Sequence, residues 1–327
     1  MSIRAGLAAQ LGAVAEDTWG TYKAPTSFVE FTEESLALAI ERIESPGLRA
    51  SNRVLRTDRW AAGQRRVEGT VSFEAPSKGL GLWLKNALGA VNITTPSGAT
   101  NARLHRHTLG DPFGLGLTVQ VGRPDVSGTV QPFSYTGAKI DSITLTNSVD
   151  EFLVVECEMV AEDEVTSENL ATASYPTAMQ LFNWTQGVIS LAGSPVGVVT
   201  DYSVTVANNH KSDRYFLGAQ TMSEPIIAGM TEITGSMTVE FDSLTNYNRF
   251  VNGTIASVNA KWIAATAIES TFFPYVEILL PDVRFDGATP AVAGPDVLTF
   301  ELSFKALYDG TDEPITIDVQ TADTASV

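Results

Sequence analysis

Apolar and polar residues alternate with a period of two along most of this 327-residue chain. Successive side chains of a β-strand point to opposite faces, so this pattern is typical of strands with one face buried and the other in water. Runs at helical spacing are scarce. The sequence therefore predicts a mainly β fold. The clearest alternating sets are Leu36, Leu38 and Ile40; Val67, Gly69, Val71 and Phe73; Val155, Cys157 and Met159; Tyr202, Val204 and Val206; Met237, Val239 and Phe241; and Leu298, Phe300, Leu302 and Phe304.

The two halves of the chain match each other when the first is shifted by 166 positions. Residues 36–40 then fall on 202–206, and residues 67–74 fall on 233–240 with the apolar parity and a glycine retained. The last strands of the halves also agree, at a different offset. Because the matches keep the same order, they favour a tandem duplication.

One short helix is predicted at the matching place in each half. A capping residue and a glycine bound each helix, Ser77 and Gly89 in the first, and Asp242 or Ser243 and Gly253 in the second. The apolar faces at helical spacing are Leu80, Trp83, Leu84, Ala87 and Leu88, and Leu244, Tyr247, Phe250 and Val251.

These patterns predict two tandem, mainly β domains, each with one short helix against its sheet. A chain of this length suits two domains of roughly 150 residues. The polar segment 168–177, closed by Pro176, marks the boundary, so the domains are expected over residues 26–168 and 177–327.

Positive charge is concentrated in one segment of an acidic chain. The net charge is −17, yet residues 42–66 hold seven arginines and two acids, which leaves 14 basic and 36 acidic residues elsewhere. The arginines are Arg42, Arg49, Arg53, Arg56, Arg59, Arg65 and Arg66.

Turn-forming residues at both ends make segment 42–66 a predicted protruding loop that carries Trp60. Arginine pairs with carboxylates and tryptophan anchors interfaces, so the loop is expected to contact an oppositely charged partner. The favoured partner is an acidic neighbouring copy, a head-to-tail contact that builds rings or filaments. A solvated loop and a nucleic-acid contact are the alternatives, although the acidic balance disfavours DNA binding.

Catalytic and cofactor-binding motifs are missing from the sequence. Cys157, the only cysteine, alternates with carboxylates and reads as a core-facing strand residue. His105 and His107 would share a strand face, but no third metal ligand can be placed, and their flanks suggest a polar loop. The glycine-rich segment 110–116 lacks the strand and helix that a phosphate-binding loop needs. We expect no enzyme activity, metal or cofactor, and a soluble chain without membrane segments made in a cytoplasm.

Four segments resemble the tail tube (major tail) proteins of long-tailed, non-contractile bacteriophages. They are GAVAEDTWGTYKAPT at 12–26, FVEFTEESL at 28–36, IESPGLR at 43–49 and DRW at 58–60. The similarity is clearest over residues 5–90. It extends to the rest mainly through the duplicated plan.

The resemblance implies two tandem tail-tube-type β-sandwich or barrel domains, each with one short flanking helix. In this family the inner sheets join around a lumen in a ring of six domains. Rings stack into the tube that carries DNA out of the capsid. With two such domains per chain, a homotrimer with pseudo-sixfold symmetry is favoured over a homohexamer. Tape-measure and tail terminator proteins are the further expected partners. The virion tail, assembled in the host cytoplasm, is the expected location.

The same resemblance assigns subunit and ring contacts to an N-terminal arm over residues 1–25 and to loop 42–66. The expected contact residues are Arg49, Arg53, Arg56, Arg59, Trp60, Arg65 and Arg66. The counterpart loop of the second half, residues 210–229, has lost most arginines and is expected to make a different contact or to belong to a decoration domain.

Two other functions remain open at the level of sequence. One is the tube of a related injection or secretion machine. The other is a carbohydrate-binding β-sandwich, because aromatic side chains can stack on sugars. Its candidate residues would be Trp19, Trp60, Trp83, Trp184 and Trp262.

Overall fold

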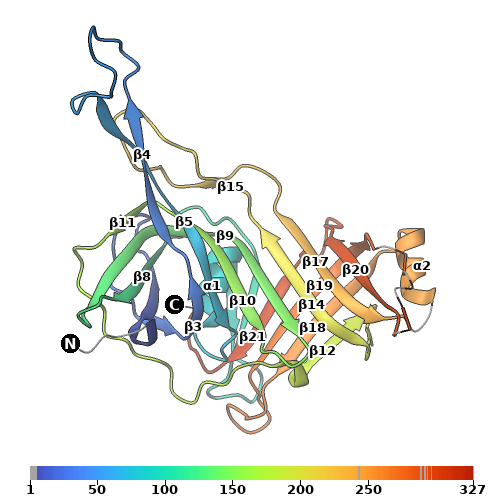
Figure 1. The fold of residues 1–327 in the computed structure, drawn as a ribbon. Helices are drawn as coiled ribbons and strands as arrows, with labels where there is room; N and C mark the ends of the chain where they lie inside the picture. Colours follow the sequence, from blue (N-terminus) through green and yellow to red (C-terminus); the bar gives the residue numbers. More distant parts are fainter. Residues whose placement is uncertain are drawn as a thin grey trace.

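The computed structural model describes residues 6–241, 244–287, 289–290, 292, 294–295 and 297–326. It is mainly β, as predicted, with antiparallel strands and short helices (Figure 1). The first half contains η1 (Gly6–Ala8), β1 (Gln10–Ala15), β2 (Ser27–Val29), β3 (Phe31–Glu34), β4 (Ala37–Glu44), β5 (Trp60–Glu74), α1 (Leu80–Leu88), β6 (Gly89–Thr94), β7 (Arg103–Leu109), β8 (Leu117–Pro124), β9 (Val130–Ser148), β10 (Val154–Ala161) and β11 (Asp163–Val165). The second half contains η2 (Trp184–Gln186), β12 (Gly187–Leu191), β13 (Ser194–Pro195), β14 (Val199–Ala207), β15 (His210–Lys211), β16 (Ile226–Ile227), β17 (Glu232–Glu240), α2 (Leu244–Asn252), β18 (Ala256–Ile263), β19 (Tyr275–Phe285), β20 (Thr299–Ala306) and β21 (Thr316–Thr321).

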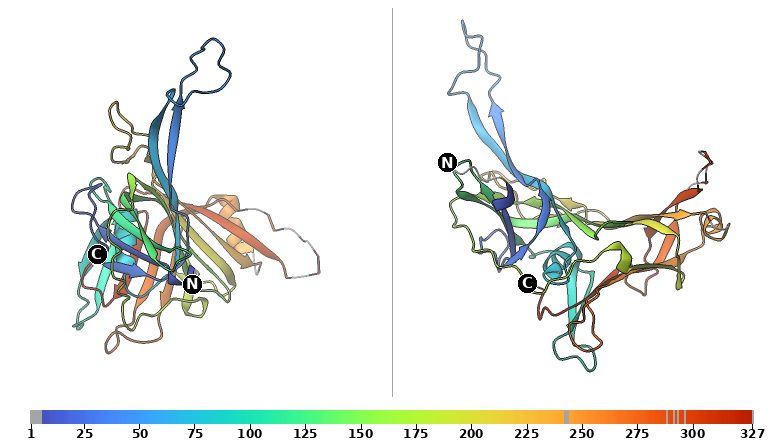
Figure 2. Two further views of the ribbon diagram at one scale, coloured as in Figure 1. Left: turned by 60° about the vertical axis from the view of Figure 1, so that its left-hand side comes forward. Right: turned by 60° about the horizontal axis from the view of Figure 1, so that its bottom comes forward.

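One long antiparallel layer, here called the main sheet, crosses both halves (Figures 1 and 2). Its order is β4–β5–β10–β9–β14–β17–β20, and the last residues of β19 pair beyond β20. The halves join where β9 pairs with β14, from Ser142 opposite Ala207 to Ser148 opposite Asp201. The strands of the two halves follow in the same order across this layer. β4, β5, β10 and β9 of the first half correspond to β14, β17, β20 and β19 of the second.

A second layer also crosses the halves, in the order β6–β7–β21–β19–β18–β12. Here β21, near the C-terminus, pairs with β7 of the first half from Thr316 opposite Thr108 to Thr321 opposite Arg103. The predicted division into domains 26–168 and 177–327 stays a prediction. Hydrogen-bonded strands bridge it in both layers.

The N-terminal segment differs from the predicted arm over residues 1–25. Residues 10–15 form β1, which pairs with β2 and β8, and Leu11 and Ala13 are fully buried. This segment is apolar on both faces, so it is stable inside a sheet and not as a solvated arm. Residues 1–5 lie outside the described part of the chain.

The hydrophobic core is continuous across the two halves. Trp83 of α1 packs against Phe73 with ring centroids 5.2 Å apart, and Tyr202 packs against Trp262 at 5.9 Å. Cys157 is buried in this core, as predicted, and burial raises the pKa of its thiol. A thiol held protonated in an apolar core has no nucleophilic role.

The glycine shared by the two halves is explained by close packing between strands. A Cβ at Gly69 would lie 2.5 Å from the backbone oxygen of Ser35, and a Cβ at Gly235 would lie 2.5 Å from that of Ser203. Backbone cannot move away as a flexible side chain can. Each position therefore accepts only glycine without a shift of the neighbouring strand.

We expect Gly235→Ala to lower the free energy of unfolding by about 1 to 3 kcal/mol, because the new methyl group would overpack the sheet. A Cβ at Gly235 would also lie 2.4 Å from the Phe304 ring. Urea denaturation followed by circular dichroism measures the loss. Gly197→Ala is the matched control, since a Cβ there meets nothing within 4 Å. Equal stability of the two variants would contradict this explanation.

Both predicted helices are present. They end at Leu88 and Asn252, directly before the predicted Gly89 and Gly253. The proposed cap Ser77 was wrong. Gly79 occupies the N-cap, and its N–H donates to Asp323 Oδ2 at 2.6 Å.

Ser77 instead accepts a hydrogen bond from the backbone N–H of Gln180 at 2.9 Å. Its side chain thus ties the segment before α1 to the chain between the halves. The proposed caps Asp242 and Ser243 lie outside the described residues. No helix of the described chain has the length and apolarity to cross a membrane.

The expectation of a polar loop at 105–107 was wrong, because these residues lie in β7. His105 and His107 are both buried on one strand face, whereas Arg106 on the other face forms an ion pair with Asp318 at 2.7 Å. His105 Nδ1 lies 2.9 Å from Ser326 Oγ, and neither ring nitrogen of His107 has a partner among the described residues. The polar residues that suggested a loop lie at the ends of a strand.

Acid is expected to destabilise the protein through His107. Burial lowers the pKa of His107 to about 3, helped by the positive charges of His105 and Lys85. The folded state keeps this imidazole neutral while the unfolded state protonates it near 6.5, so stability falls as the pH drops through that interval. The loss is about 4 to 5 kcal/mol between pH 6.5 and pH 3. Denaturant titrations should show a shallower acid limb for His107→Leu; parallel curves would contradict the assignment.

Candidate assembly surfaces

The arginine-rich segment is a β-hairpin that projects beyond the body of the molecule in every view (Figures 1 and 2). Strands β4 and β5 form its shaft, and residues 45–59 form its tip. Val67 has the first buried side chain of β5, because Gly63 is buried but has no side chain, so residues 60–66 lie outside the core. At the usual rise per strand residue, these seven residues span roughly 23 Å. The loop predicted over 42–66 is therefore a stiff two-stranded arm with an irregular end.

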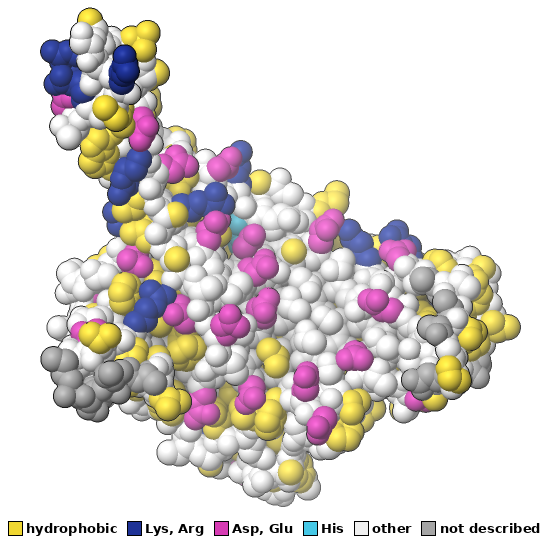
Figure 3. Space-filling view, viewed as in Figure 1, with side chains coloured by type: hydrophobic (Ala, Val, Ile, Leu, Met, Phe, Trp, Pro, Cys, Tyr) yellow, Lys and Arg dark blue, Asp and Glu magenta, His cyan; other side chains and the backbone are white. Residues whose placement is uncertain are grey.

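The predicted contact residues divide between the tip and the shaft. Arg56 and Arg59 share Asp58 of the same tip, at 2.9 and 3.7 Å, and these arginines lower the pKa of that carboxyl. Arg49 and Arg53 have no ion-pair partner in the described part of the chain. Arg49, Arg53 and Arg59 are exposed, and the Arg56 side chain is 39% exposed, so positive charge gathers at the end of the hairpin (Figure 3).

The shaft residues Arg65 and Arg66 are already paired within the chain. Arg65 binds Asp163 at 2.6 Å, and Arg66 binds Glu68. Trp60 begins β5 at half exposure with the Arg42 guanidinium 5.7 Å from its ring centroid. The structure thus brings Arg49, Arg53, Arg56 and Arg59 together at the tip and places Arg65 and Arg66 apart from them.

The tryptophans do not form a common surface. Trp83 and Trp262 are buried in the core, and Trp19 donates its indole N–H to Gly137 O at 3.0 Å. Trp60 lies on the hairpin. Trp184 is the first residue of η2 and follows Asn183, which forms an isolated β-bridge with Phe152 of the β9–β10 connection. A sugar-stacking platform built from these residues is therefore not supported.

The second-half counterpart of the hairpin, residues 208–229, is here called the strap. It does not project but folds across the first half. Gln220 O accepts the backbone N–H of Arg65 at 2.9 Å, and the Tyr215 hydroxyl donates to Arg65 O at 2.9 Å. Sequence reasoning expected a different contact for this loop, and the contact made is with the base of the hairpin.

Two polar contacts, each with one fully buried side chain, anchor the strap. Lys139 Nζ lies 2.7 Å from Glu224 of the strap, and burial lowers the pKa of this lysine against the opposing effect of Glu224. His210 Nδ1 lies 3.1 Å from Asp141 Oδ1, and the histidine lowers the pKa of that carboxyl although burial opposes the shift. The strap therefore holds the hairpin base to the body.

The outer face of the main sheet carries hydroxyl and carboxylate side chains. At the seam between the halves, Thr144 and Thr205 lie 2.9 Å apart through their hydroxyls, and Thr146 and Ser203 lie 3.2 Å apart. Carboxylates are spread over this face, with few cations (Figure 3). The residues in register on it are Glu68, Thr70, Ser72, Glu74, Glu156, Glu158, Ser142, Thr144, Thr146, Ser148, Asp201, Ser203, Thr205, Glu232, Thr234, Ser236, Thr238, Glu240, Thr299, Glu301, Ser303 and Lys305.

The first edge of the main sheet lacks the cover that its counterpart has. Val204 and Val206 of β14, which has a strand on either side, are fully buried. Their equivalents in the first half, Leu38 and Ile40, are only partly buried, because β4 pairs with β5 alone among the described strands. One face of these two side chains still meets water.

The opposite edge of the main sheet, at β20, is also incompletely paired. Strand β20 pairs with β17 along Thr299–Lys305 but with β19 only from Phe304 on. Beside it, α2 has no buried residue, and Leu244 and Val251 are exposed. Its counterpart α1 is buried almost completely and receives a hydrogen bond from Asn208 of the second half at Ala87 O, 2.7 Å. Sequence reasoning missed these edges, although the equivalence of positions 38 and 204 was a usable signal.

No group of three His, Cys, Asp or Glu side chains in the described chain is arranged to hold a metal ion. Among the described residues, cavities lie where β9 ends and β14 begins, beside β2 and at the hairpin tip. The surfaces suited to a function are thus the hairpin, the polar sheet face and the two open edges.

Comparison with known proteins agrees with this emphasis on assembly surfaces. The family model of the phage tail tube protein matches residues 6–306. No curated protein matches the chain. Because the match spans nearly the whole chain and the fold is the β-rich one that the resemblance implied, the chain belongs to the phage tail tube protein family.

Proposed function

We propose that three copies of this chain close head to tail into a ring, and that stacked rings form the tail tube through which DNA leaves the capsid. The observation that carries the proposal is the β9–β14 junction inside the chain. It joins two equivalent four-strand units edge to edge. The chain leaves β4, the equivalent of β14, open at one end. At the other end β19, the equivalent of β9, pairs with β20 only from Phe304 on, so the rest of the β20 edge is open.

The two edges are different surfaces, so their contact is heterologous. Such contacts generate closed rings or open filaments, never isolated dimers. Pairing β4 of one copy beside β20 and α2 of the next would cover Leu38 and Ile40 as Val204 and Val206 are covered now. It would also remove two exposed sheet edges, which are aggregation hazards in a free chain.

Stoichiometry follows from the repeat. Each chain supplies two units to the main sheet, so three chains make six units and a pseudo-sixfold ring. A homohexamer would need twelve units, and it is the alternative that a chain count must exclude. We further propose that both halves, over residues 26–168 and 177–327, are tube domains.

The polar face of the main sheet would line the lumen. Carboxylates there repel DNA phosphates, and hydroxyl groups offer no fixed positive charge, so the genome would slide without specific binding. Rings would stack through the hairpin, and the tube ends would meet the tape-measure and tail terminator proteins. We place the tube in the virion tail, assembled in the host cytoplasm and without membrane contact. The family match favours this phage role over a related secretion tube.

Negative-stain electron microscopy of the purified full-length chain, with and without its tail partners, tests the proposal. We expect rings or hollow rods. Native mass spectrometry of single rings should count three chains. A chain that stays monomeric at high concentration in the presence of its tail partners would overturn the ring, and a count of six would overturn the trimer alone.

A further inference from the structure

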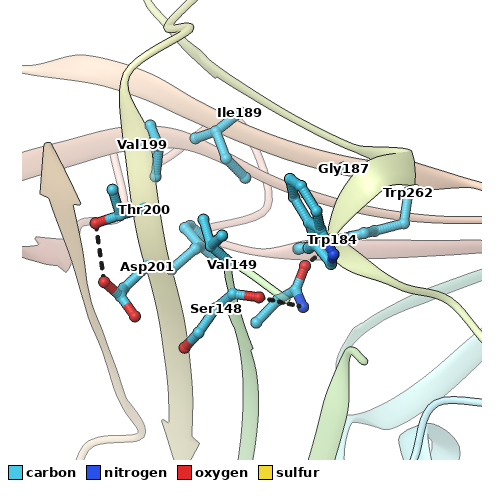
Figure 4. Close-up of a pocket in the computed structure, with 11 residues that line it drawn as sticks. Ser148, Val149, Trp184, Gly187, Ile189, Val199, Thr200, Asp201 and Trp262 are labelled. Carbon is cyan, nitrogen blue, oxygen red and sulfur yellow. Dashed lines mark hydrogen bonds between the residues drawn. The ribbon is translucent and has the colours of Figure 1, made fainter. Parts of the chain in front are cut away.

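A shallow pocket lies at the end of the main sheet opposite the hairpin, where β9 ends and β14 begins (Figure 4). Val149 stands between Trp184 on one side and Thr200 and Asp201 on the other. Ile189 and Tyr202 complete the lining that matters here. Val149 and Trp184 are 51% and 42% exposed, so the pocket offers uncovered apolar surface as well as a carboxylate.

The Asp201 carboxylate is the charged group of this pocket. It lies on the outer face of β14, whereas the Tyr202 side chain lies on the opposite face and packs against Trp262 in the core. The Asp201 carboxylate accepts from the Thr200 hydroxyl at 2.9 Å and has no cation beside it in the described chain.

The surroundings of the pocket are acidic. Asp150 and Glu151 form the adjoining β9–β10 turn, and Glu74 and Glu240 end neighbouring strands on the same side of the sheet. None of these four carboxylates has an ion-pair partner in the described chain. An exposed indole and a carboxylate together suit a guanidinium group, which stacks on aromatic rings and only donates hydrogen bonds.

The hairpin tip carries the complementary chemistry. Arg49 and Arg53 lack ion-pair partners within the described chain, and Leu48 and Val54 beside them are exposed apolar residues. The tip and the pocket also lie at opposite ends of the same strands, because β5 runs from Trp60 at the hairpin to Glu74, which is paired with Val154 just past the β9–β10 turn. Copies stacked with the same polarity therefore bring the tip of one against the pocket of the next.

We propose that this pocket receives the hairpin tip of a second copy in the adjacent ring. Arg49 or Arg53 pairs with Asp201, while Leu48 or Val54 covers the exposed side chains of Val149 and Trp184. The inference rests on the proposed stacking of rings and names the surface that receives the hairpin.

Asp201→Lys tests the inference by electron microscopy and sedimentation. We expect single rings without stacked tubes, because two cations would then face each other. Glu158→Lys, the same charge change in the middle of the same sheet face, is the matched control and should still stack. Normal tubes from Asp201→Lys would overturn the docking site while leaving the ring intact. Absence of rings from the wild-type chain would overturn the proposed function, and this inference with it.

Cross-linking locates the contact directly. Chains carrying Arg53→Cys and chains carrying Asp201→Cys are mixed and oxidised, and the native Cys157 does not compete because it is buried. We expect disulfide-linked pairs from this mixture and none when Glu158→Cys replaces Asp201→Cys. Tubes that assemble from the mixture without the disulfide would overturn the proposed pairing.

Discussion

Replacing Arg53, Arg56 and Arg59 together by glutamate is expected to abolish tube formation while the chain stays folded. The three side chains lie on the projecting tip, and their only ion-pair partner in the described chain is Asp58 of the same tip. The body of the protein therefore does not depend on them. Reversal would turn the tip from positive to negative and set it against carboxylates of the neighbouring ring. Electron microscopy and thermal unfolding measure the two expectations.

The matched control keeps the positive charge at these three positions and changes the geometry of the charged group. A variant with lysine at the same three positions should still form tubes, with greater sensitivity to salt, because lysine lacks the bidentate guanidinium contact. Normal tubes from the glutamate variant would remove the hairpin from the account of stacking. Loss of folding in that variant would contradict the exposed, self-contained tip described above.

Leu38→Lys combined with Ile40→Lys is expected to prevent ring closure. These residues are the first-half equivalents of Val204 and Val206, which are fully buried at the β9–β14 junction. If the same junction forms between copies, two ammonium groups would be buried without partners. That cost exceeds what a contact between copies supplies. Analytical ultracentrifugation should find monomers at concentrations where the wild type forms rings.

The isolated chain tolerates this double change better than the ring does, because both side chains are partly exposed before assembly. Val126→Lys is the control, since Val126 is exposed in a turn between β8 and β9. It should form rings normally. Rings of normal size from the double variant would show that β4 is not the closing edge.

Structural features that depend on residues close together in the sequence were predictable from the sequence. Alternation gave the strands and their buried parity, including Cys157, and helical spacing with a following glycine gave both helices. Predictions from short stretches of sequence were wrong where a residue or strand far along the chain supplies the contact. Ser77 was a plausible cap, but Gly79 occupies the N-cap, and its N–H donates to Asp323 from the far end of the chain. Polar flanks suggested a loop at 105–107, but β21 pairs with that segment and buries it.

The sequence by itself determined that the chain is mainly β, that its halves share one pattern and that its cations cluster in one segment. Only the tertiary structure decided that β9 pairs with β14 and β7 with β21, that the strap lies against the hairpin base, and which edges stay open. Hydrogen bonds between strand backbones are nearly independent of residue type, so a sequence specifies which face of a strand is buried far better than which strand lies beside it.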